Sequence, residues 1–497
     1  MKKIDLFLLI FFTVISESIP QTHIPPGNVS GVWTKANSPY IIDGEITVPN
    51  TETLIIEPGV NIIFSGHDML IVQGRVLAIG TQQDTILFTS QQPTIGWHGI
   101  RLINVSAEND TSIFEFCIFE YGAANTGTAE QERCGGAIYV KLSKLRVSNC
   151  LFRYNLTYHP NPIYTGGGAI ALVGGYQLIE NCEFYENSSN FASAIIIWYT
   201  SSVPMIRNNY FHDNNGHGLI NIGSGAHPEI VNNFIVSNYC TGHGLIHFSN
   251  GSGIAIFTNN TIVLNTGYGG TIYENDGSDP IFINNIIWGN EPAQVNLEAP
   301  TNLSFINCLL EGGQNAFIGG NYFQGLYQNC IDDDPEFENS EVCRLKNNSP
   351  CIGKGIDSIQ LGSIWYYSPN EDFYGNLRPS PVGSNPDIGA YENPLGSPVI
   401  EVEESVNSVP DAFQLKQNFP NPFNPSTTIE FTLPQAGNVK LTVYNLLGEE
   451  VAQLVNEFKE AGVHTINFNA SGLNSGVYIY KLEANGLVQT RKMTLLK

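Results

Sequence analysis

The chain has 497 residues, enough for two or three domains, and its 22 basic and 46 acidic side chains give a formal net charge of −24. Such an acidic surface excludes nucleic acid as a partner and disfavours anionic polysaccharides unless calcium bridges them. The charge is uneven, because residues from 410 onward carry seven basic and seven acidic side chains, whereas the preceding residues carry 15 and 39.

The first 18 residues have the composition of a secretory signal peptide. Two lysines precede an apolar run from Leu6 to Ile15, and two serines follow as small residues for a cleavage site. The run is too short to span a membrane as a stable helix, and no later stretch is long enough. We therefore expect residues 1–18 to be removed on export and the rest of the chain to contain no transmembrane segment.

A six-residue signature recurs through the middle of the chain. An apolar residue is followed two positions later by Asn and five positions later by a second apolar residue. The copies begin at Val147, Ile179, Ile206, Ile230, Phe257 and Ile283, and the last copy, counted from Ile283, lacks one residue before its Asn pair. Their Asn residues are spaced by 32, 27, 24, 27 and 25 residues. A period in the twenties predicts a solenoid in which each repeat covers the apolar face of its neighbour.

The repeats are expected to be strands that bend at the Asn. Apolar and polar residues alternate in each copy, which indicates strands rather than helices. Ile179 and Phe184 are five residues apart, so both can point inward only if the strand bends between them. Asn tolerates the left-handed backbone of such a bend, and stacked strands lie about 4.8 Å apart. We therefore predict a structural ladder, hydrogen-bonded from coil to coil, of Asn149, Asn181, Asn208, Asn232, Asn259 and Asn284.

Two further columns follow the same spacing. One is a second Asn column, Asn155, Asn187, Asn214, Asn238, Asn265 and Asn290, and the other is an inward Ile column, Ile138, Ile170, Ile195, Ile220, Ile246 and Ile272. The segment from Leu54 to Ser90, with its turn Glu57–Val60, and the segment from Asp334 to Glu392 resemble the opening and closing segments of bacterial right-handed parallel β-helix proteins, which have the pectin lyase-like fold. This resemblance implies an all-β solenoid over residues 19–395, with an N-terminal cap and a closing segment.

The residues that follow the inward Ile column are expected to face outward on a flat parallel sheet. Aromatic and amide side chains recur there. Such a face suits sugar rings, which stack on aromatic side chains and hydrogen-bond to amides, although the same residues are also ordinary on the surface of a Tyr-rich sheet. The predicted ligand-binding residues are Tyr139, Trp198, Asn221, His247 and Tyr273.

His217 and His243 are the candidates for catalysis. Each lies in a Gly-His-Gly, one repeat apart, so their side chains should stack. Gly-His-Gly also occurs in polygalacturonases, which share the fold, but the other acidic and basic motifs of that family are missing. A metal-binding His pair is the alternative. A lyase of this fold needs a base, and no Lys or Arg lies between Arg207 and Arg344.

Calcium is the cofactor that the sequence leaves open. Asp332, Asp333 and Asp334 are candidate calcium ligands and, alternatively, part of the polar closing loop that the β-helix resemblance implies. No other cofactor is expected.

Nine cysteines lie between Cys117 and Cys351, and an odd number leaves at least one thiol unpaired. We interpret one column of them, Cys117, Cys150, Cys182 and Cys308, as buried thiols that act as small hydrophobic side chains. Cys343 and Cys351 flank a short segment and are the candidates for a disulfide. No Cys/His cluster has zinc spacing.

The composition changes after residue 395. Residues 396–412 are rich in Pro, Ser and Glu, as in a linker. Residues 413–497 contain short alternating runs separated by turns, the pattern of a small antiparallel β-sandwich of the immunoglobulin-like kind. The motifs Asn418–Pro425, Val443–Gly448 and Gly476–Leu482 are similar to those of the type A sorting domain of the type IX secretion system, also called the Por secretion system.

The sorting-domain resemblance implies export through the Sec route and then across the outer membrane of a Gram-negative bacterium of the Bacteroidetes kind. The implied partners of residues 413–497 are the type IX translocon and sortase, and the implied site of attachment is surface lipopolysaccharide. The implied location is therefore outside the cell or on its outer surface.

Two hypotheses remain for the function of the β-helix. The first is a surface protein that binds a polysaccharide or acts as an adhesin. Its FxxN and GGAI motifs are similar to those of the chlamydial polymorphic outer-membrane adhesins. The second is a polysaccharide lyase or glycoside hydrolase. An aromatic and amide face favours binding, whereas a cluster of carboxylates with a base would favour the enzyme.

Overall fold

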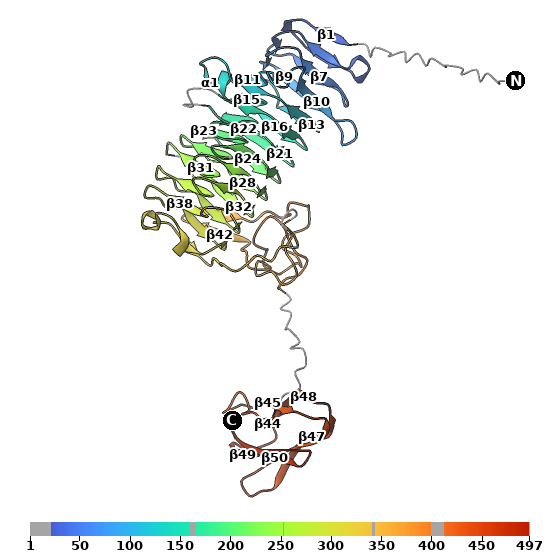
Figure 1. Cartoon of the computed structure of the whole chain (residues 1–497), viewed down its shortest axis with the longest axis vertical. Coiled ribbons are helices and arrows are strands. Elements are labelled where there is room, and N and C mark those ends of the chain that lie inside the picture. Colours follow the sequence, from blue (N-terminus) through green and yellow to red (C-terminus); the bar gives the residue numbers. More distant parts are fainter. Residues whose placement is uncertain (1–20, 159–164, 252, 340–342, 399–411, 497) are drawn as a thin grey trace, which may run out of the picture. The chain divides into compact units, whose positions relative to one another are not determined.

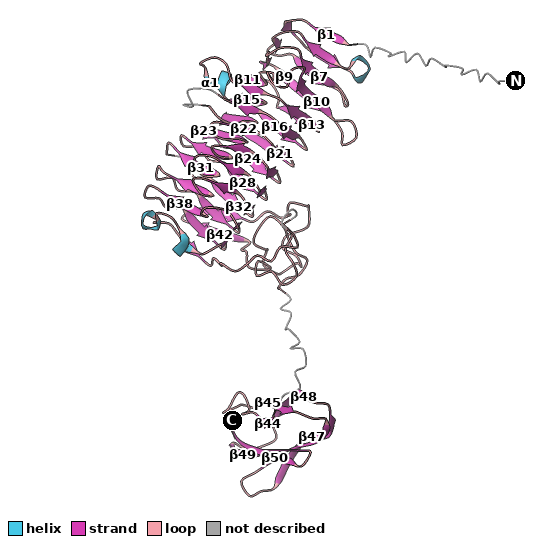
Figure 2. Cartoon of the chain, viewed as in Figure 1, coloured by secondary structure: helices cyan, strands magenta, loops and turns pink. Residues whose placement is uncertain are grey.

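The structure of the protein is a computed structural model that describes residues 21–158, 165–251, 253–339, 343–398 and 412–496 (Figure 1). The chain divides into two compact units, Met1–Val399 and Ile400–Lys497. The predicted signal peptide and most of the predicted linker lie outside the described residues. Strands make up nearly all the regular structure of both units (Figure 2).

The first unit is a solenoid in which the chain passes repeatedly through three parallel sheets, here called sheets A, B and C, in that order. Over the described residues these sheets have 12, 11 and 12 strands. Each strand pairs in parallel with its counterpart in the next coil, so the coils stack in chain order (Figure 1). A short fourth sheet, sheet E, lies between sheets A and B in the middle coils.

The strand bounds follow the repeat. Sheet A comprises β1 (Thr22–Ile24), β4 (Tyr40–Ile42), β7 (Asn61–Phe64), β10 (Ile86–Ser90), β13 (Cys117–Glu120), β17 (Leu151–Arg153), β21 (Glu183–Tyr185), β25 (Tyr210–His212), β29 (Phe234–Val236), β33 (Thr261–Val263), β37 (Ile286–Trp288) and β40 (Leu309–Leu310). Sheet B comprises β2 (Gly27–Asn28), β5 (Ile46–Val48), β8 (Leu70–Val72), β11 (Ile100–Ile103), β15 (Ile138–Lys141), β19 (Ile170–Gly175), β23 (Ile195–Ser202), β27 (Ile220–Gly223), β31 (Ile246–Ser249), β35 (Ile272–Glu274) and β38 (Val295–Leu297). Sheet C comprises β3 (Gly31–Trp33), β6 (Thr53–Ile56), β9 (Arg75–Ile79), β12 (Ser112–Glu115), β16 (Leu145–Ser148), β20 (Gln177–Glu180), β24 (Met205–Arg207), β28 (Glu229–Val231), β32 (Ile256–Thr258), β36 (Ile281–Ile283), β39 (Ser304–Ile306) and β41 (Tyr327–Gln328). Sheet E comprises β14 (Ala123–Ala124), β18 (Leu156–Thr157), β22 (Ser188–Ser189), β26 (Asn215–Gly216), β30 (Tyr239–Cys240) and β34 (Thr266–Gly267), and the short helices are η1 (Lys35–Asn37), α1 (Glu130–Arg133), η2 (Gln314–Ala316) and η3 (Gly320–Tyr322).

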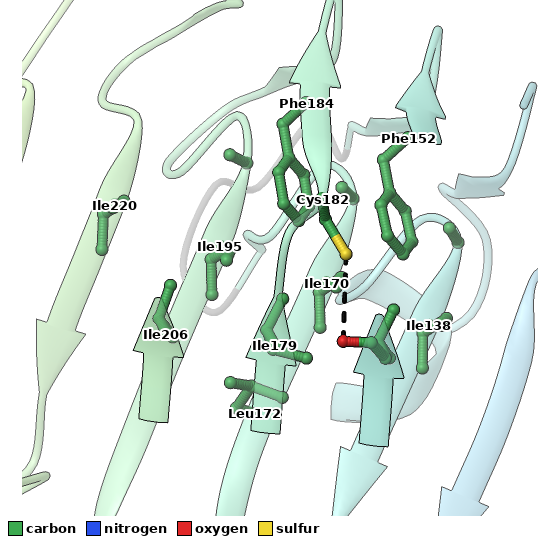
Figure 3. Close-up of a cluster of buried hydrophobic side chains, with 14 of the residues drawn as sticks. Ile138, Phe152, Ile170, Leu172, Ile179, Cys182, Phe184, Ile195, Ile206 and Ile220 are labelled. Carbon is green, nitrogen blue, oxygen red and sulfur yellow. Dashed lines mark hydrogen bonds between the residues drawn. The ribbon is translucent and has the colours of Figure 1, made fainter. Parts of the chain in front are cut away.

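The inside of the coils is one continuous apolar core. The predicted inward Ile column is fully buried in it. Equivalent side chains of successive coils stack on one another, as Phe152 and Phe184 do with ring centroids 4.8 Å apart (Figure 3). Because burying a large apolar side chain contributes about 1.5–3 kcal/mol, this stacked core is what stabilises the solenoid.

The left-handed bend predicted between sheets C and A is present. Asn149, Asn181, Asn208, Asn232, Asn259 and Asn284 all have φ between 53° and 56°. Ile179 and Phe184, on the two sides of one such bend, are both fully buried. The prediction that Asn bends the strand is therefore confirmed.

The hydrogen-bonded ladder, however, lies one residue later than predicted. Asn209, Asn233, Asn260 and Asn285 bond in succession, each Nδ2 donating to the next Oδ1 at 2.9–3.0 Å. Within the predicted set the structure gives one such bond, from Asn284 Nδ2 to Asn259 Oδ1 at 3.3 Å. The prediction was wrong because the left-handed residue turns its own side chain outward and the next residue inward.

The second Asn column forms a ladder as well. Its members bond from Asn155 to Asn290, with each Nδ2 donating to the Oδ1 of the next coil at 2.9–3.0 Å. The sixth repeat is also complete. The prediction that it begins at Ile283 and lacks one residue before its Asn pair was wrong. β36 pairs with β32 so that Phe282 aligns with Phe257, which makes Phe282 the apolar residue that precedes the Asn pair.

The closing segment covers the last coils and is bound by the outward Asn residues. Asn232, Asn259 and Asn284 donate from Nδ2 to the carbonyl oxygens of Glu371, Asp387 and Ile356 at 2.7, 3.0 and 2.9 Å. The hairpin of β42 (Ser358–Leu361) and β43 (Ile364–Tyr367) belongs to one apolar cluster with β36 and β39 of sheet C. The first Asn of each pair therefore docks the closing segment in these coils.

The cysteines form no disulfide among the described residues. The predicted Cys343–Cys351 bridge was therefore wrong. Both side chains lie instead in an apolar cluster between the closing segment and sheet A, where burial raises the pKa of Cys343 to about 12. The predicted column of buried thiols is present, and Cys150 and Cys182 each donate to a carbonyl oxygen at 3.2 Å.

The second unit is an antiparallel sandwich of a three-stranded and a four-stranded sheet. Its strands are β44 (Gln414–Leu415), β45 (Ser426–Leu433), β46 (Gly437–Tyr444), β47 (Glu450–Lys459), β48 (Gly462–Asn469), β49 (Gly476–Ala484) and β50 (Leu487–Leu495). The hydroxyl group of Tyr480 donates to the carbonyl of Lys416 and accepts from the backbone N–H of Asn418, each at 2.8 Å. Two of the predicted sorting motifs are thus joined in the core.

Replacing Asn233 by Ala is expected to lower the free energy of unfolding by about 1–3 kcal/mol, because the buried N–H groups of Asn209 lose their acceptor. Chemical denaturation measures the change. The matched control is Asn208→Gly, whose φ of 55° suits Gly and whose Oδ1 has no partner within the described residues. Equal losses in the two variants would contradict the assignment of the ladder.

Candidate functional site

The predicted ligand-binding residues lie on the outer face of sheet B. Parallel register aligns Arg101, Tyr139, Ala171, Ile196, Asn221, His247 and Tyr273 in one outward column. They face outward from the core as predicted, but they are not accessible to solvent, because the exposed fractions are 0% for Tyr139, 7% for Trp198, 1% for Asn221, 3% for His247 and 7% for Tyr273. Residues from the segments between sheets A and B contact this face, as Glu130 does at Tyr139 and Phe191 does at His247.

Four of the five residues form one chain of contacts across successive coils. Trp198 Nε1 donates to Asn221 Oδ1 at 3.0 Å, and Asn221 Nδ2 lies 3.2 Å from His247 Nδ1. The ring of His247 meets that of Tyr273 edge-on, with centroids 5.0 Å apart. Tyr139 lies three coils from Asn221, about 14 Å away at the usual strand spacing. The structure therefore brings together four predicted residues and separates the fifth.

His243 extends this cluster toward the surface. Its ring stacks on His247 with centroids 4.5 Å apart and lies 5.6 Å from the rings of Phe191 and Tyr273. Burial, reinforced by His243, lowers the pKa of His247 to about 3, and burial with the nearby His217 lowers the pKa of His243. Neutral imidazoles offer one donor and one acceptor, which suits the hydroxyl groups of a sugar.

Glu130 is a site residue that the sequence did not indicate. It comes from α1, and it accepts hydrogen bonds from the hydroxyl groups of Tyr139 at 2.5 Å and Tyr199 at 2.9 Å. Lys141 Nζ lies 3.9 Å from the same carboxylate. Burial and the bond to Glu130 raise the pKa of Tyr139, so its phenol stays protonated. The available signal was loop length, because 13 residues separate β14 from β15 but three separate β26 from β27.

Arg101 neighbours Tyr139 in the outward column of sheet B and is fully buried. Its Nη1 donates to the carbonyl oxygens of Ile100 and Gly135 at 3.1 and 2.9 Å, while Nε and Nη2 have no partner within the described residues. Burial lowers the pKa of Arg101 to about 9. Burying a cation with two unpaired nitrogen atoms costs free energy. The packing around Arg101 must therefore offset this cost.

The carboxylates near the histidines differ in access. Glu274, on the inward side of β35, is fully buried and accepts from the backbone N–H groups of Asp276 and Ser278. Glu298 is exposed and lies near His243 and Tyr273. Burial of Tyr273, together with this carboxylate, raises the pKa of that phenol to about 12. One accessible carboxylate beside neutral imidazoles can hydrogen-bond a ligand, whereas glycosidic hydrolysis uses a pair of carboxyl groups.

The acidic candidates for a calcium site do not converge. Asp332, Asp333 and Asp334 are exposed, and Asp334 accepts a hydrogen bond from the backbone N–H of Glu336. Across the described ranges, no group of three or more His, Cys, Asp or Glu side chains is arranged to hold a metal ion. Likewise, none of the helices in the described part of the chain has the length and hydrophobicity of a membrane span.

Comparison with family models agrees with both units. A model described as "Right handed beta helix region" matches residues 94–262 and 193–363. The chain belongs to this family. In this β-helix protein, residues 417–495 match a "Secretion system C-terminal sorting domain", so the tail interacts with the type IX secretion machinery and directs the protein out of the cell or to its surface. Searches of curated proteins and of solved structures find no match to this β-helix protein.

Replacing His247 by Gln is expected to reduce the acid sensitivity of the fold. The pKa of His247 is lowered to about 3 by burial, so between pH 6.5 and 3 the unfolded chain binds a proton that the folded chain does not. Stability is therefore lost as the pH falls, by on the order of 1 kcal/mol per pH unit. Chemical denaturation of the wild-type protein and of His247→Gln at several pH values from 8 to 4 tests this expectation. A difference in the free energy of unfolding that stays constant over that range would contradict it.

Proposed function

We propose that this β-helix protein is a surface-exposed glycan-binding or adhesive protein whose ligand contacts the covered face of sheet B. The observation that carries the proposal is the chain of contacts Trp198–Asn221–His247–Tyr273, on which the half-buried ring of His243 stacks. In this proposal Trp198, Asn221, His247 and Tyr273 orient the site from below, and Tyr139 acts at a distance from them through Glu130, which binds Tyr199. His217, His243, Tyr199 and Glu298, which are exposed or half-buried, present polar atoms to the ligand.

Binding without turnover is the form of this function that the chemistry favours. Glu298 is the accessible carboxylate of the histidine cluster, and the imidazoles are neutral. Hydrogen bonds from neutral groups and contacts with aromatic rings supply affinity without a general acid. Attachment of the exported protein to surface lipopolysaccharide would place the β-helix among polymers outside the cell.

The test is binding of the full chain to an array of neutral and acidic oligosaccharides, with and without calcium, beside assays for reducing ends and unsaturated uronates. We expect calcium-independent binding that His243→Ala weakens, no release of product, and no effect of His227→Ala, a control on the turn between sheets B and C. Product release abolished by His217→Ala or His243→Ala would establish the lyase or hydrolase alternative instead.

A further inference from the structure

A groove of about 620 Å³ lies on the outer face of sheet C, away from the residues just described. Its floor includes Arg146 of β16, Leu178 of β20 and Met205 of β24, which parallel register aligns on successive coils. Lys144 and Tyr176 line it from the turns that lead into these strands. This volume is in the range of pockets that bind small ligands.

The guanidinium group of Arg146, which lines this groove, and that of Arg207 are fixed by one buried carboxylate. Glu180 Oε1 accepts from Arg146 Nε at 3.1 Å, and Glu180 Oε2 accepts from Arg207 Nη2 at 2.6 Å. The side chain of Glu180 is 7% exposed, whereas those of Arg146 and Arg207 are 46% and 45% exposed. Each guanidinium has five N–H donors, so both retain donors for a ligand.

The position of Arg207 follows from the pleat of the sheet. It lies two residues after Met205 on β24, so both side chains leave the same face, and Met205 lines the groove. Lys144 is exposed at the rim and adds a third positive charge. Among the residues that line this groove, Glu229 supplies the negative charge. With the paired carboxylate of Glu180 counted as well, three cations stand against two carboxylates, so the local charge of +1 is opposite in sign to the −24 of the whole chain.

Apolar and aromatic surface accompanies these cations. The side chain of Tyr176 is 75% exposed, and Leu178 and Met205 are half-buried beneath the groove. A sugar ring can stack on the phenol ring with its C–H groups against the aliphatic floor. Carboxylate and sulfate groups are the partners that guanidinium groups bind bidentately.

We propose that this groove on sheet C binds an acidic saccharide, with its carboxylate or sulfate groups on Arg146 and Arg207 and a ring on Tyr176. The site is separate from the face of sheet B and does not depend on the function proposed there. The net charge of the chain predicts that anionic polysaccharides are disfavoured. This groove is an exception, because basic side chains are concentrated there.

The test is calorimetric titration of the full chain, in EDTA, with a galacturonate hexamer, a chondroitin sulfate hexamer and neutral cellohexaose. We expect an acidic probe to bind, with affinity that falls as salt rises. Tyr176→Ala and Lys144→Gln should each weaken binding, the former about tenfold. The double variant Arg146→Gln/Glu180→Gln, which leaves no unpaired buried carboxylate, should abolish it. The carboxylated and sulfated probes distinguish the two anion types.

The matched control is Arg153→Gln on sheet A. Arg153 pairs with Glu120 at 2.6 Å much as Arg207 pairs with Glu180, but its side chain projects from another sheet. The proposal would be overturned if Arg153→Gln weakened binding of the acidic probe as much as the groove variants do. It would also be overturned if cellohexaose bound as tightly as the acidic probe, or if neither acidic probe bound. An acidic peptide that displaces the saccharide at equal concentration would show a peptide site and overturn it as well. His243→Ala should leave this binding unchanged.

Discussion

Replacing Arg378 by Met is expected to lower the free energy of unfolding by about 3–5 kcal/mol, because it leaves a buried carboxylate without its counter-ion. Arg378 Nε donates to Glu392 Oε2 at 2.9 Å, and both side chains have no exposed area. Arg378 also donates to Asn232 Oδ1 at 2.7 Å and to the carbonyl of Gly389 at 3.0 Å. The substitution therefore removes one of the two contacts between the closing segment and Asn232, whose Nδ2 still donates to the carbonyl of Glu371.

Two further variants isolate the cause. Arg344→Met changes the same residue type in the same segment, but Arg344 is exposed and lies over the ring of Tyr374, so a change of less than about 1 kcal/mol is expected. Arg378→Met/Glu392→Met removes both charges and should recover part of the loss. If Arg378→Met is no more destabilising than Arg344→Met in chemical denaturation, the ion pair does not hold the closing segment.

The same segment contains a carboxyl group that is an unusually weak acid. Burial and the neighbouring Glu392 raise the pKa of Asp387 to about 8. Between its ordinary pKa and pH 8 the folded chain therefore holds more protons than the unfolded chain, so this group favours folding as the pH falls. This sign is opposite to that of His247, and the two effects lie in different parts of the β-helix.

The periodic part of the fold could be predicted from the sequence because stacking imposes the same demands on every coil. The Ile column must be buried and the bend must tolerate a positive φ, so both recur at a fixed spacing. The ladder was misplaced by one residue because the spacing of an Asn pair does not tell which member faces inward. Only the backbone conformation at Asn208 decides that Asn209, and not Asn208, lies inside.

The sites depend on parts of the chain that do not repeat. Glu130 comes from a loop that occurs in one coil, and its bonds to Tyr139 and Tyr199 join residues 9 and 69 positions away. The groove on sheet C likewise joins Lys144 to Glu229 across several coils. Periodicity reports which side of a strand is buried in the core, but it contains no information on how aperiodic loops cover the opposite side.

Deleting residues 413–497 is expected to abolish surface display and leave the β-helix folded in the periplasm of a type IX host. The sorting-domain match lies within these residues, and the sandwich has its own core, around Leu441, Tyr480 and Met493. Within the described part of the chain, the β-helix core is built from residues of the first unit. Protease treatment of intact cells, compared with osmotically opened cells, measures display, and a cooperative thermal transition of the periplasmic fraction measures folding.

The reverse experiment separates sorting from stability. Residues 413–497 joined to an unrelated periplasmic reporter should carry that reporter to the surface, because the sandwich folds around a core that it supplies itself. Tyr480→Ala in this fusion should prevent export, since the Tyr480 hydroxyl group joins Lys416 and Asn418 in the core and the side chain is fully buried. Surface display of the truncated β-helix, or of the reporter without the tail, would show that the export signal lies elsewhere.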